Sequence, residues 1–199
     1  MKSAYAFFGI LLVLIIIGAA YSFSRKTGAP DTSDIINTTE SMATALSITS
    51  SAFENDGRIP SKFTCDGDKS LSPQLSFSGV PSGTKSLTLV MDDPDVPKQL
   101  RPDGVFDHWT LFNIPPETTG IPEGISAGTS GVNGAGKNAY TGPCPPTQYE
   151  PSEHRYIFAL YALDTMLSLP EGVTKQEVLQ AIDGHILAEA RLIGRYSRK

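Results

Sequence analysis

The sequence predicts a mainly β domain, an antiparallel β-sandwich of two sheets with peripheral helices, preceded by an N-terminal transmembrane or signal helix. Three observations support this fold class. Glycine and proline recur densely between Gly57 and Gly172. Short runs of apolar, β-branched and aromatic residues lie between them, and one later segment has helical spacing. Many short strands separated by turn-forming residues are typical of sandwiches and barrels.

Four apolar runs have the length and composition of strands, namely 75–77, 86–91, 106–114 and 156–163. Thr174 and Glu177 form a capping box, and the apolar residues that follow recur at helical spacing until Gly184. Residues 185–196 alternate between polar and apolar, which predicts a half-buried strand, with a continuing helix as the alternative. The Gly-rich segment 115–142 has no strong period and is predicted as a long loop.

The N-terminus predicts a membrane anchor over residues 1–24, because the run from Ala4 to Ala20 is almost entirely apolar. A helix of this length spans the hydrocarbon core of a bilayer, and a cleaved signal peptide is the alternative. Residues 25–46 are rich in Ser, Thr, Ala and Asp and predict a flexible tether. Residues 47–199 have the size of one domain. We therefore expect a domain outside the cytoplasm, either membrane-anchored or secreted after cleavage.

The overall composition narrows the choice of partners. The formal net charge is −5, the isoelectric point is about 5.2, and no basic stripe runs along the domain. This charge balance disfavours nucleic acid as a partner. The two cysteines, Cys65 and Cys144, leave two alternatives open: a disulfide, as in many exported domains, or two partly buried free thiols.

Two short matches to enzyme motifs lack the structural context that those motifs need. The segment from Gly124 to Gly128 matches a nucleophile elbow, but no strand precedes it and no helix follows it. The segment 131–138 resembles a phosphate-binding P-loop, but Asn138 stands where Ser or Thr would hold magnesium. We therefore expect no metal, no cofactor and no such catalytic nucleophile.

A set of short strings, in this order, resembles the phosphatidylethanolamine-binding protein family, and most closely its bacterial and archaeal branch, often labelled Raf-kinase-inhibitor-like. The resemblance covers the chain from about residue 47 to the end. The strings are Phe63-Thr64-Cys65-Asp66-Gly67 with Ser72-Pro73, Asp93-Pro94-Asp95-x-Pro97, Asp107-His108-Trp109, Tyr140-x-Gly142-Pro143-Cys144-Pro145-Pro146, His154-Arg155-Tyr156, Tyr161-Ala162-Leu163-Asp164 and Gly184-His185-x-Leu187-Ala188-Glu189-Ala190.

The resemblance implies a small anion pocket at one end of a two-sheet sandwich, and a homodimer. Carried over by motif, the ligand-binding residues are Asp93, Asp95, Pro97, His108, Tyr140, Gly142, Cys144, Pro146, His154 and Tyr156. The chemistry fits, because imidazole and phenol groups donate hydrogen bonds to phosphate oxygens and a carboxylate can orient an imidazole. A buried polar network that merely fixes loops is the alternative. Glu150 and Glu153, before His154, are expected to weaken anion binding at the pocket mouth.

The resulting hypothesis is a non-enzymatic binding protein for a small anionic or phosphorylated ligand, such as a phospholipid headgroup, attached to the membrane through its N-terminal segment. A second hypothesis is a protease inhibitor or kinase regulator that contacts a protein partner through the exposed segment 120–137. A third, a hydrolase that uses His and Asp as acid and base, has weaker support because no convincing nucleophile is present.

Overall fold

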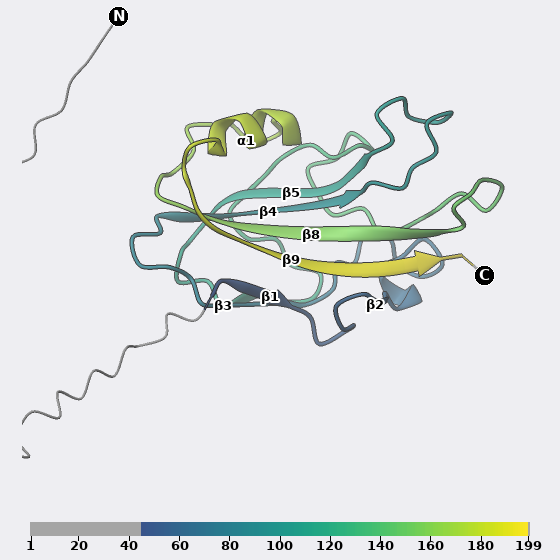
Figure 1. Cartoon of the computed structure of the whole chain (residues 1–199), viewed down its shortest axis with the longest axis horizontal. Coiled ribbons are helices and arrows are strands. Elements are labelled where there is room, and N and C mark those ends of the chain that lie inside the picture. The colour runs from purple at the N-terminus through teal and green to yellow at the C-terminus, as the bar shows by residue number, and fades with distance from the viewer. Residues whose placement is uncertain (1–44, 199) are drawn as a thin grey trace, which may run out of the picture. The chain divides into compact units, whose positions relative to one another are not determined.

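The computed structural model describes residues 45–198, in which two β-sheets stack face to face and one α-helix lies on the outer face of the larger sheet (Figure 1). The smaller sheet is antiparallel, with the strand order β1 (Ser47–Thr49), β3 (Leu75–Ser78) and β6 (Gly120–Ile121). The larger sheet has the order β2 (Gly57–Arg58), β9 (Ile186–Ser197), β8 (Glu153–Leu163), β4 (Ser86–Asp93), β5 (Phe106–Ile114) and β7 (Thr129–Ser130). The helices are the 3₁₀ turn η1 (Ser61–Phe63) and α1 (Lys175–Ile182).

The structure confirms the predicted strands and corrects the prediction that both sheets are antiparallel. The larger sheet is mixed, because β2 runs parallel to the end of β9, with Gly57 opposite Gly194. A two-residue edge strand is too short to show a period in the sequence. The 185–196 segment is a strand rather than a continuing helix. The predicted loop 115–142 contains two short strands, β6 and β7, which pair with β3 and β5 respectively.

The expected membrane anchor and nearly all of the expected tether lie outside the described residues. Leu46, the last residue assigned to the tether, is buried in the core. Within residues 45–198, no helix is both long enough and apolar enough to cross a bilayer.

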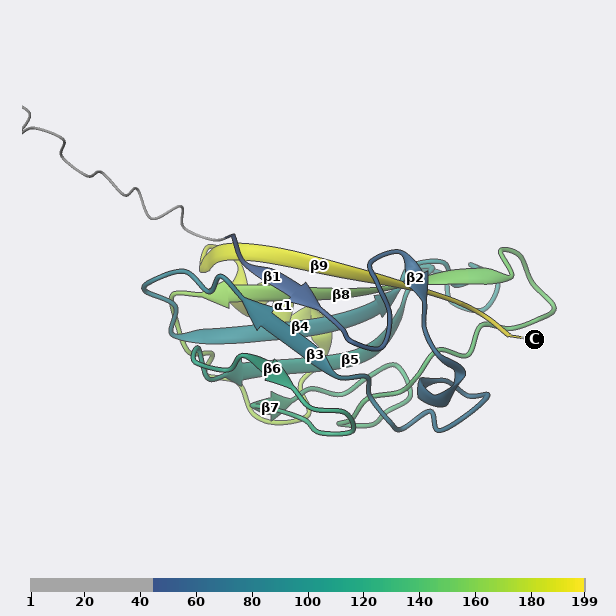
Figure 2. The same cartoon turned by 90° about the horizontal axis from the view of Figure 1, so that it is seen from below.

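The larger sheet is covered on both faces, which explains why residues 86–91 of β4 are all buried. Its inward side chains, including Leu87, Leu89 and Met91, pack between the two sheets. Its outward Val90 packs with Val178 and Ile182 of α1. Figure 2 shows the smaller sheet in front of the larger one and α1 behind it, in agreement with Figure 1. Strands buried on both faces are expected to lose the polar–apolar alternation.

The helix α1 begins and ends as the sequence predicts. The Thr174 hydroxyl accepts a hydrogen bond from the Glu177 N–H, and the Glu177 carboxylate accepts one from the Thr174 N–H, which completes the capping box. Gly184 follows with a φ of 78°, in the left-handed region that glycine adopts without strain. Nδ1 of the His185 ring, just after this glycine, lies 2.8 Å from an oxygen of Asp164.

Lys175, at the start of α1, pairs with two carboxylates on the outer face of the larger sheet. Asp92 and Asp107 stand directly opposite each other on β4 and β5, an arrangement in which like charges repel. The Lys175 ammonium lies 2.9 Å from Asp92 and 2.6 Å from Asp107. Burial opposes the charged form of Lys175, but the two carboxylates outweigh it and raise its pKa. This cation therefore holds together the strand ends next to Asp93 and His108.

We expect Lys175→Met to lower the free energy of unfolding at neutral pH by about 2 kcal/mol, less than for a fully buried pair because these groups are partly exposed. The reason is that two adjacent carboxylates lose their shared cation. Urea unfolding measures the effect. Lys85→Met, at an exposed position, is the matched control and should change stability by less than about 0.5 kcal/mol. Equal losses in the two variants would contradict the role given to Lys175.

Candidate ligand-binding cavity

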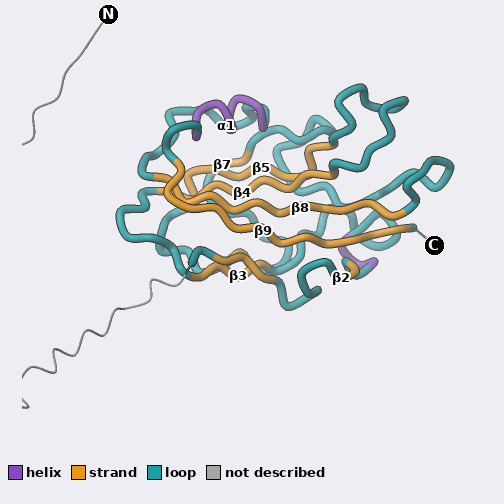
Figure 3. Tube along the Cα trace, viewed as in Figure 1, coloured by secondary structure: helices purple, strands orange, loops and turns teal. Residues whose placement is uncertain are grey.

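The sheet topology brings three distant segments to one end of the larger sheet. The strand β4 is antiparallel to both of its neighbours, β5 and β8. Its C-terminal end, with Asp93, therefore meets the first residues of β5 and β8, which carry His108 and His154. Figure 3 shows that long loops gather at this end of the sheet. Side chains on strand ends are held by the ladder, while loops provide the surrounding walls.

A cavity of about 360 Å³ opens at this end, a volume within the range of small-molecule sites. Six of the ten sequence-predicted site residues line it: Asp93, His108, Gly142, Cys144, Pro146 and His154. Six further residues complete the lining: Val96, Leu100, Arg101, Phe106, Thr141 and Pro145. The walls are therefore mostly apolar, and the polar groups are few and convergent.

A β-bulge in β5 directs His108 toward the cavity. The register shifts by one residue between Met91 and Asp92, so that Met91 faces Trp109, Asp92 faces Asp107, and His108 has no residue opposite it in β4. As a result, His108 and Trp109 both face the inner side. The ring of His108 contacts Tyr156 at 5.2 Å between centroids. Bulges commonly redirect a side chain in this way.

His154 and Asp93 form a buried ion pair at the base of the cavity. Nδ1 of His154 lies 2.7 Å from Oδ2 of Asp93, and the exposed fractions of the two side chains are 0% and 5%. Burial opposes the charged form of His154, but the hydrogen bond and the charge of Asp93 outweigh it and raise its pKa. The other ring nitrogen, Nε2, is buried without a protein partner. When the ring is protonated, Nε2–H is a donor without an acceptor.

His108, unlike His154, has a lowered pKa. Its Nδ1 hydrogen-bonds the carbonyl oxygen of Thr141, which fixes the tautomer of the neutral ring with Nδ1–H as donor. Burial lowers the pKa of His108, and this effect outweighs the attraction of Asp93. The neutral ring is therefore favoured near pH 7, and its Nε2 is a hydrogen-bond acceptor. The two histidines present complementary groups, one donor and one acceptor.

Four sequence-predicted residues do not line the cavity: Asp95, Pro97, Tyr140 and Tyr156. The Tyr140 hydroxyl donates to the Phe63 carbonyl oxygen at 3.0 Å, which ties two loops together. The Tyr156 hydroxyl is buried without a partner, and its ring supports His108. Burial raises the pKa of both tyrosines, so both stay neutral.

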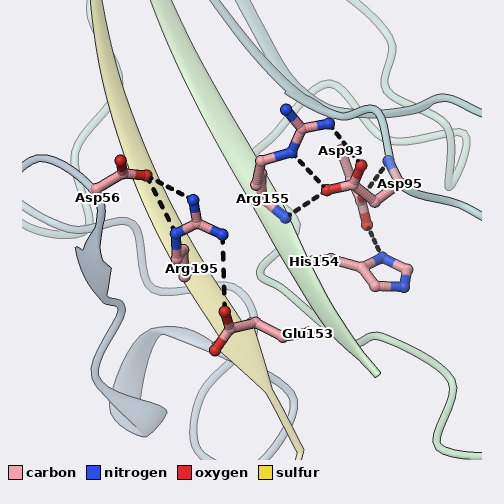
Figure 4. A network of polar contacts seen from close by, with 7 residues as sticks. All are labelled: Asp56, Asp93, Asp95, Glu153, His154, Arg155 and Arg195. Carbon is pink, nitrogen blue, oxygen red and sulfur yellow. Dashed lines mark hydrogen bonds and ion pairs between the residues drawn. The ribbon is translucent and has the colours of Figure 1, made fainter. Parts of the chain in front are cut away.

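Asp95 belongs to a neighbouring ion pair rather than to the cavity. Its carboxylate accepts two hydrogen bonds from the Arg155 guanidinium, at 2.9 and 2.7 Å, and these lower its pKa. The Asp95 N–H donates to Asp93 at 2.9 Å, which helps to position that carboxylate (Figure 4). Glu153 lies 3.7 Å from Arg195, and neither Glu150 nor Glu153 lines the cavity. The expected repulsion at the pocket mouth therefore has no support from their positions.

A disulfide joins Cys65 to Cys144, so the structure decides between the two alternatives that the sequence left open. The same two segments are also joined by the Cys65 N–H, which donates to the Pro143 carbonyl oxygen at 3.0 Å. Gly142 approaches this segment so closely that a Cβ atom would collide with the carbonyl oxygen of Phe63. These contacts hold in place the cavity wall formed by residues 141–146.

Sequence reasoning missed Arg101 and Phe106, which face the cavity from the connection between β4 and β5 and from the first residue of β5. The Arg101 guanidinium lies over the Phe106 ring, 5.3 Å from its centroid. The sequence places Phe106 at the start of a predicted strand, but the face of the sheet on which its side chain lies depends on the bulge at His108. Arg101 gave no periodic signal, because it lies in a turn.

This protein is a β-sandwich that has a cavity at one end of its larger sheet. Comparison with known proteins identifies its family. The profile described as phosphatidylethanolamine-binding protein matches residues 49–197. A protein of Methanothermobacter thermautotrophicus, named UPF0098 protein, is 46% identical over 160 residues, which cover 77% of this chain and 99% of the relative. A Chlamydia trachomatis protein of the same name is 46% identical over 154 residues, with the same coverage. The chain belongs to the phosphatidylethanolamine-binding protein family, as the resemblance predicted.

Two solved structures share this fold. The crystal structure of CT736 from Chlamydia trachomatis, described as a homologue of phosphatidylethanolamine-binding protein, matches with a TM-score of 0.73 and 46% identity, covering 78% of this chain and 99% of that one. The crystal structure of YbcL from E. coli, described as a member of the mammalian PEBP family, matches with a TM-score of 0.68 and 27% identity, covering 77% and 99%. The chain thus belongs to a family of binding proteins.

The Asp93–His154 pair predicts a pH-dependent contribution to stability. A raised folded pKa means that this contribution is complete below the ordinary histidine pKa of about 6.5 and is lost as the pH rises through the folded value. Asp93→Asn should therefore lower the pKa of His154 and destabilise the fold by about 1–3 kcal/mol near pH 6, and by less at higher pH. NMR titration of the imidazole and urea unfolding measure both effects.

Asp95→Asn is the control for this variant, because Asp95 lies near His154 but bonds Arg155. It should lower the His154 pKa by less than Asp93→Asn does. A His154 pKa that is unchanged in Asp93→Asn would contradict the ion pair.

The disulfide predicts a second stability effect. It joins residues that are 79 positions apart, so it removes many conformations from the unfolded chain. The double variant Cys65→Ser, Cys144→Ser should lower the free energy of unfolding by about 2–4 kcal/mol relative to the oxidised protein. Denaturant unfolding, with thiol titration to establish the redox state, measures this difference. Equal stability of the two proteins would contradict this contribution of the disulfide to folding.

Proposed function

We propose that this protein binds a small phosphate-type anion, of the kind found in phospholipid headgroups, without turning it over. One observation carries the proposal: His154 lines the cavity, and its Nε2 is buried without a protein partner. Burying a polar group without a hydrogen bond costs free energy, and unsatisfied groups of this kind commonly mark a functional site. An anionic oxygen is the acceptor that best suits this donor.

The Asp93 carboxylate determines which nitrogen of His154 meets the ligand. Because Nδ1–H donates to Asp93, the second proton of the imidazolium sits on Nε2, which is the nitrogen left for a ligand. A charge-assisted hydrogen bond from this N–H to a phosphate oxygen is stronger than one between neutral groups. Asp93 therefore acts by orienting the ring, which explains a carboxylate next to an anion site.

The acceptor on His108 favours a ligand with a donor as well as an anionic oxygen. Its Nε2 accepts a hydrogen bond when the ring is neutral, and burial favours the neutral ring. A headgroup that joins a phosphate to an ammonium or hydroxyl group supplies both partners. The apolar wall, which includes Val96, Leu100 and Pro146, suits the carbon atoms of such a molecule.

Binding without catalysis is the simpler reading of the lining residues. Cys144 lines the cavity, but its sulfur is held in the disulfide with Cys65 and is not a thiolate nucleophile. Asp93 is bonded to His154, and Nδ1 of His108 is bonded to the Thr141 carbonyl oxygen. An Asp–His pair could also serve as a general base, but the one lining cysteine is held in a disulfide, so the lining supports recognition of a ligand better than covalent catalysis.

A soluble phospholipid headgroup tests the proposal directly. We expect glycerophosphoethanolamine to bind the protein, and His154→Gln to weaken binding about tenfold or more, because a hydrogen bond between charged groups is worth about 1.5–3 kcal/mol. NMR titration measures both affinities. His185→Gln is the matched control: His185 also bonds an aspartate at 2.8 Å but does not line the cavity, and its loss should leave binding unchanged.

The affinity should also fall as the pH rises through the folded pKa of His154, because the deprotonated ring has no Nε2–H to donate. The charge of this phosphodiester does not change in that range, so the effect reports on the protein. If His154→Gln binds as tightly as the parent, the ligand does not use this donor and the assignment fails.

A further inference from the structure

Arg101 is the one lysine or arginine among the cavity-lining residues of the described chain. It lies in the connection between β4 and β5, where its backbone N–H donates to the Pro97 carbonyl oxygen at 3.1 Å. The turn thus fixes its Cα position while the side chain reaches the cavity. Nothing in its sequence surroundings distinguishes it from Lys98, three residues earlier, which is exposed and does not line the cavity.

The guanidinium is positioned but not neutralised. It lies over the face of Phe106, 5.3 Å from the ring centroid, in a cation–π contact that leaves its N–H groups free to donate. Its nearest carboxylate, Asp103, is 3.7 Å away with 64% of its side chain exposed. A pair at that distance and exposure is weak, because solvent and salt screen it. A planar donor held against an aromatic wall is well placed to meet an oxyanion.

The charges of the other lining residues nearly cancel. Asp93 and the imidazolium of His154 together contribute no net charge, and His108 is neutral because burial disfavours its protonated form, which lowers its pKa. The cavity would therefore have no net positive charge without Arg101. Arg101 therefore supplies the electrostatic attraction that draws an anion into the cavity. The histidines contribute hydrogen bonds once the anion has entered.

We propose that Arg101 selects the charge of the ligand, and that the ligand joins one anionic group to an apolar group that packs on Leu100 and Phe106. This inference rests on the proposed function, since it assigns a second, cationic contact to the same ligand. It places the anion between the Arg101 guanidinium and Nε2 of His154. The apolar part lies along the wall, where Leu100 is 48% exposed at the mouth of the cavity.

Three soluble phosphate esters separate the two parts of this inference. Dibutyl phosphate carries one negative charge and two apolar chains, dimethyl phosphate carries the charge with little apolar surface, and triethyl phosphate carries no charge. The parent protein should bind dibutyl phosphate more tightly than either of the others, by about tenfold over dimethyl phosphate because several methylene groups are buried. NMR titration at two salt concentrations gives the affinities and their salt dependence.

Arg101→Gln should weaken the binding of dibutyl phosphate about tenfold and remove most of its salt dependence, because the variant loses the charge and the bidentate contact. Lys98→Gln, with the same charge change on the same loop, should weaken it less than about twofold. Arg101→Lys keeps the charge but not the planar donors, so it should bind with intermediate affinity and keep the salt dependence.

Failure of the inference is distinct from failure of the proposed function. If Arg101→Gln binds dibutyl phosphate as the parent does while His154→Gln does not, Arg101 only packs on Phe106 and this inference is wrong. Equal effects of Arg101→Gln and Lys98→Gln would also overturn it, since any nearby charge would then suffice. If the parent binds neither anionic ester nor glycerophosphoethanolamine, the proposed function fails, and this inference fails with it.

Discussion

The buried ion pair between His154 and Asp93 is the interaction on which the rest of the site depends. An uncompensated charge at this depth would be costly, so the two groups stabilise each other at 2.7 Å. This pairing occupies one nitrogen of the imidazole and leaves the other buried without a protein partner, in a residue that lines the cavity. In the proposed function, an anionic oxygen of the ligand accepts a hydrogen bond from this N–H, and His108 and Arg101 make the other polar contacts.

At the end of the larger sheet that carries Asp93 and His108, the inner and outer faces make different polar contacts. On the inner face, Asp93 and His108, which lies at the bulge, line the cavity. On the outer face, Lys175 of α1 binds Asp92 and Asp107, which directly precede those two residues in the chain. Neighbouring residues in a strand point to opposite faces, so the outer ion pairs fix the backbone from which the inner groups project. The disulfide then holds the opposite wall.

The sequence predicted the parts of this arrangement that have a local signal. The strand runs, the capping box of α1 and the polar strings around Asp93, His108 and His154 were all visible, because hydrophobic period and turn chemistry are local properties. The parallel pairing of β2 was not, because two residues have no period. Strict alternation along β5 would place His108 with Thr110, on the face toward α1, and only the register shift shows otherwise.

The cavity lining was predicted incompletely for the same reason. Motif strings indicate which polar residues could bind a ligand. Which of these residues line the same cavity depends on long-range packing. Asp95 looked equivalent to Asp93 in the sequence, yet its carboxylate binds the Arg155 guanidinium rather than His154 (Figure 4). Arg101 looked like an ordinary surface charge, and its place over Phe106 follows from how the connection between β4 and β5 folds back.

Proton uptake on ligand binding tests the central claim most directly. Calorimetric titration of glycerophosphoethanolamine, in buffers of different ionisation enthalpy at a pH just above the folded pKa of His154, reports the number of protons that the complex gains. Because an anion on Nε2 favours the imidazolium, the account predicts net uptake that disappears in His154→Gln. Binding with no proton uptake in the parent protein would contradict it.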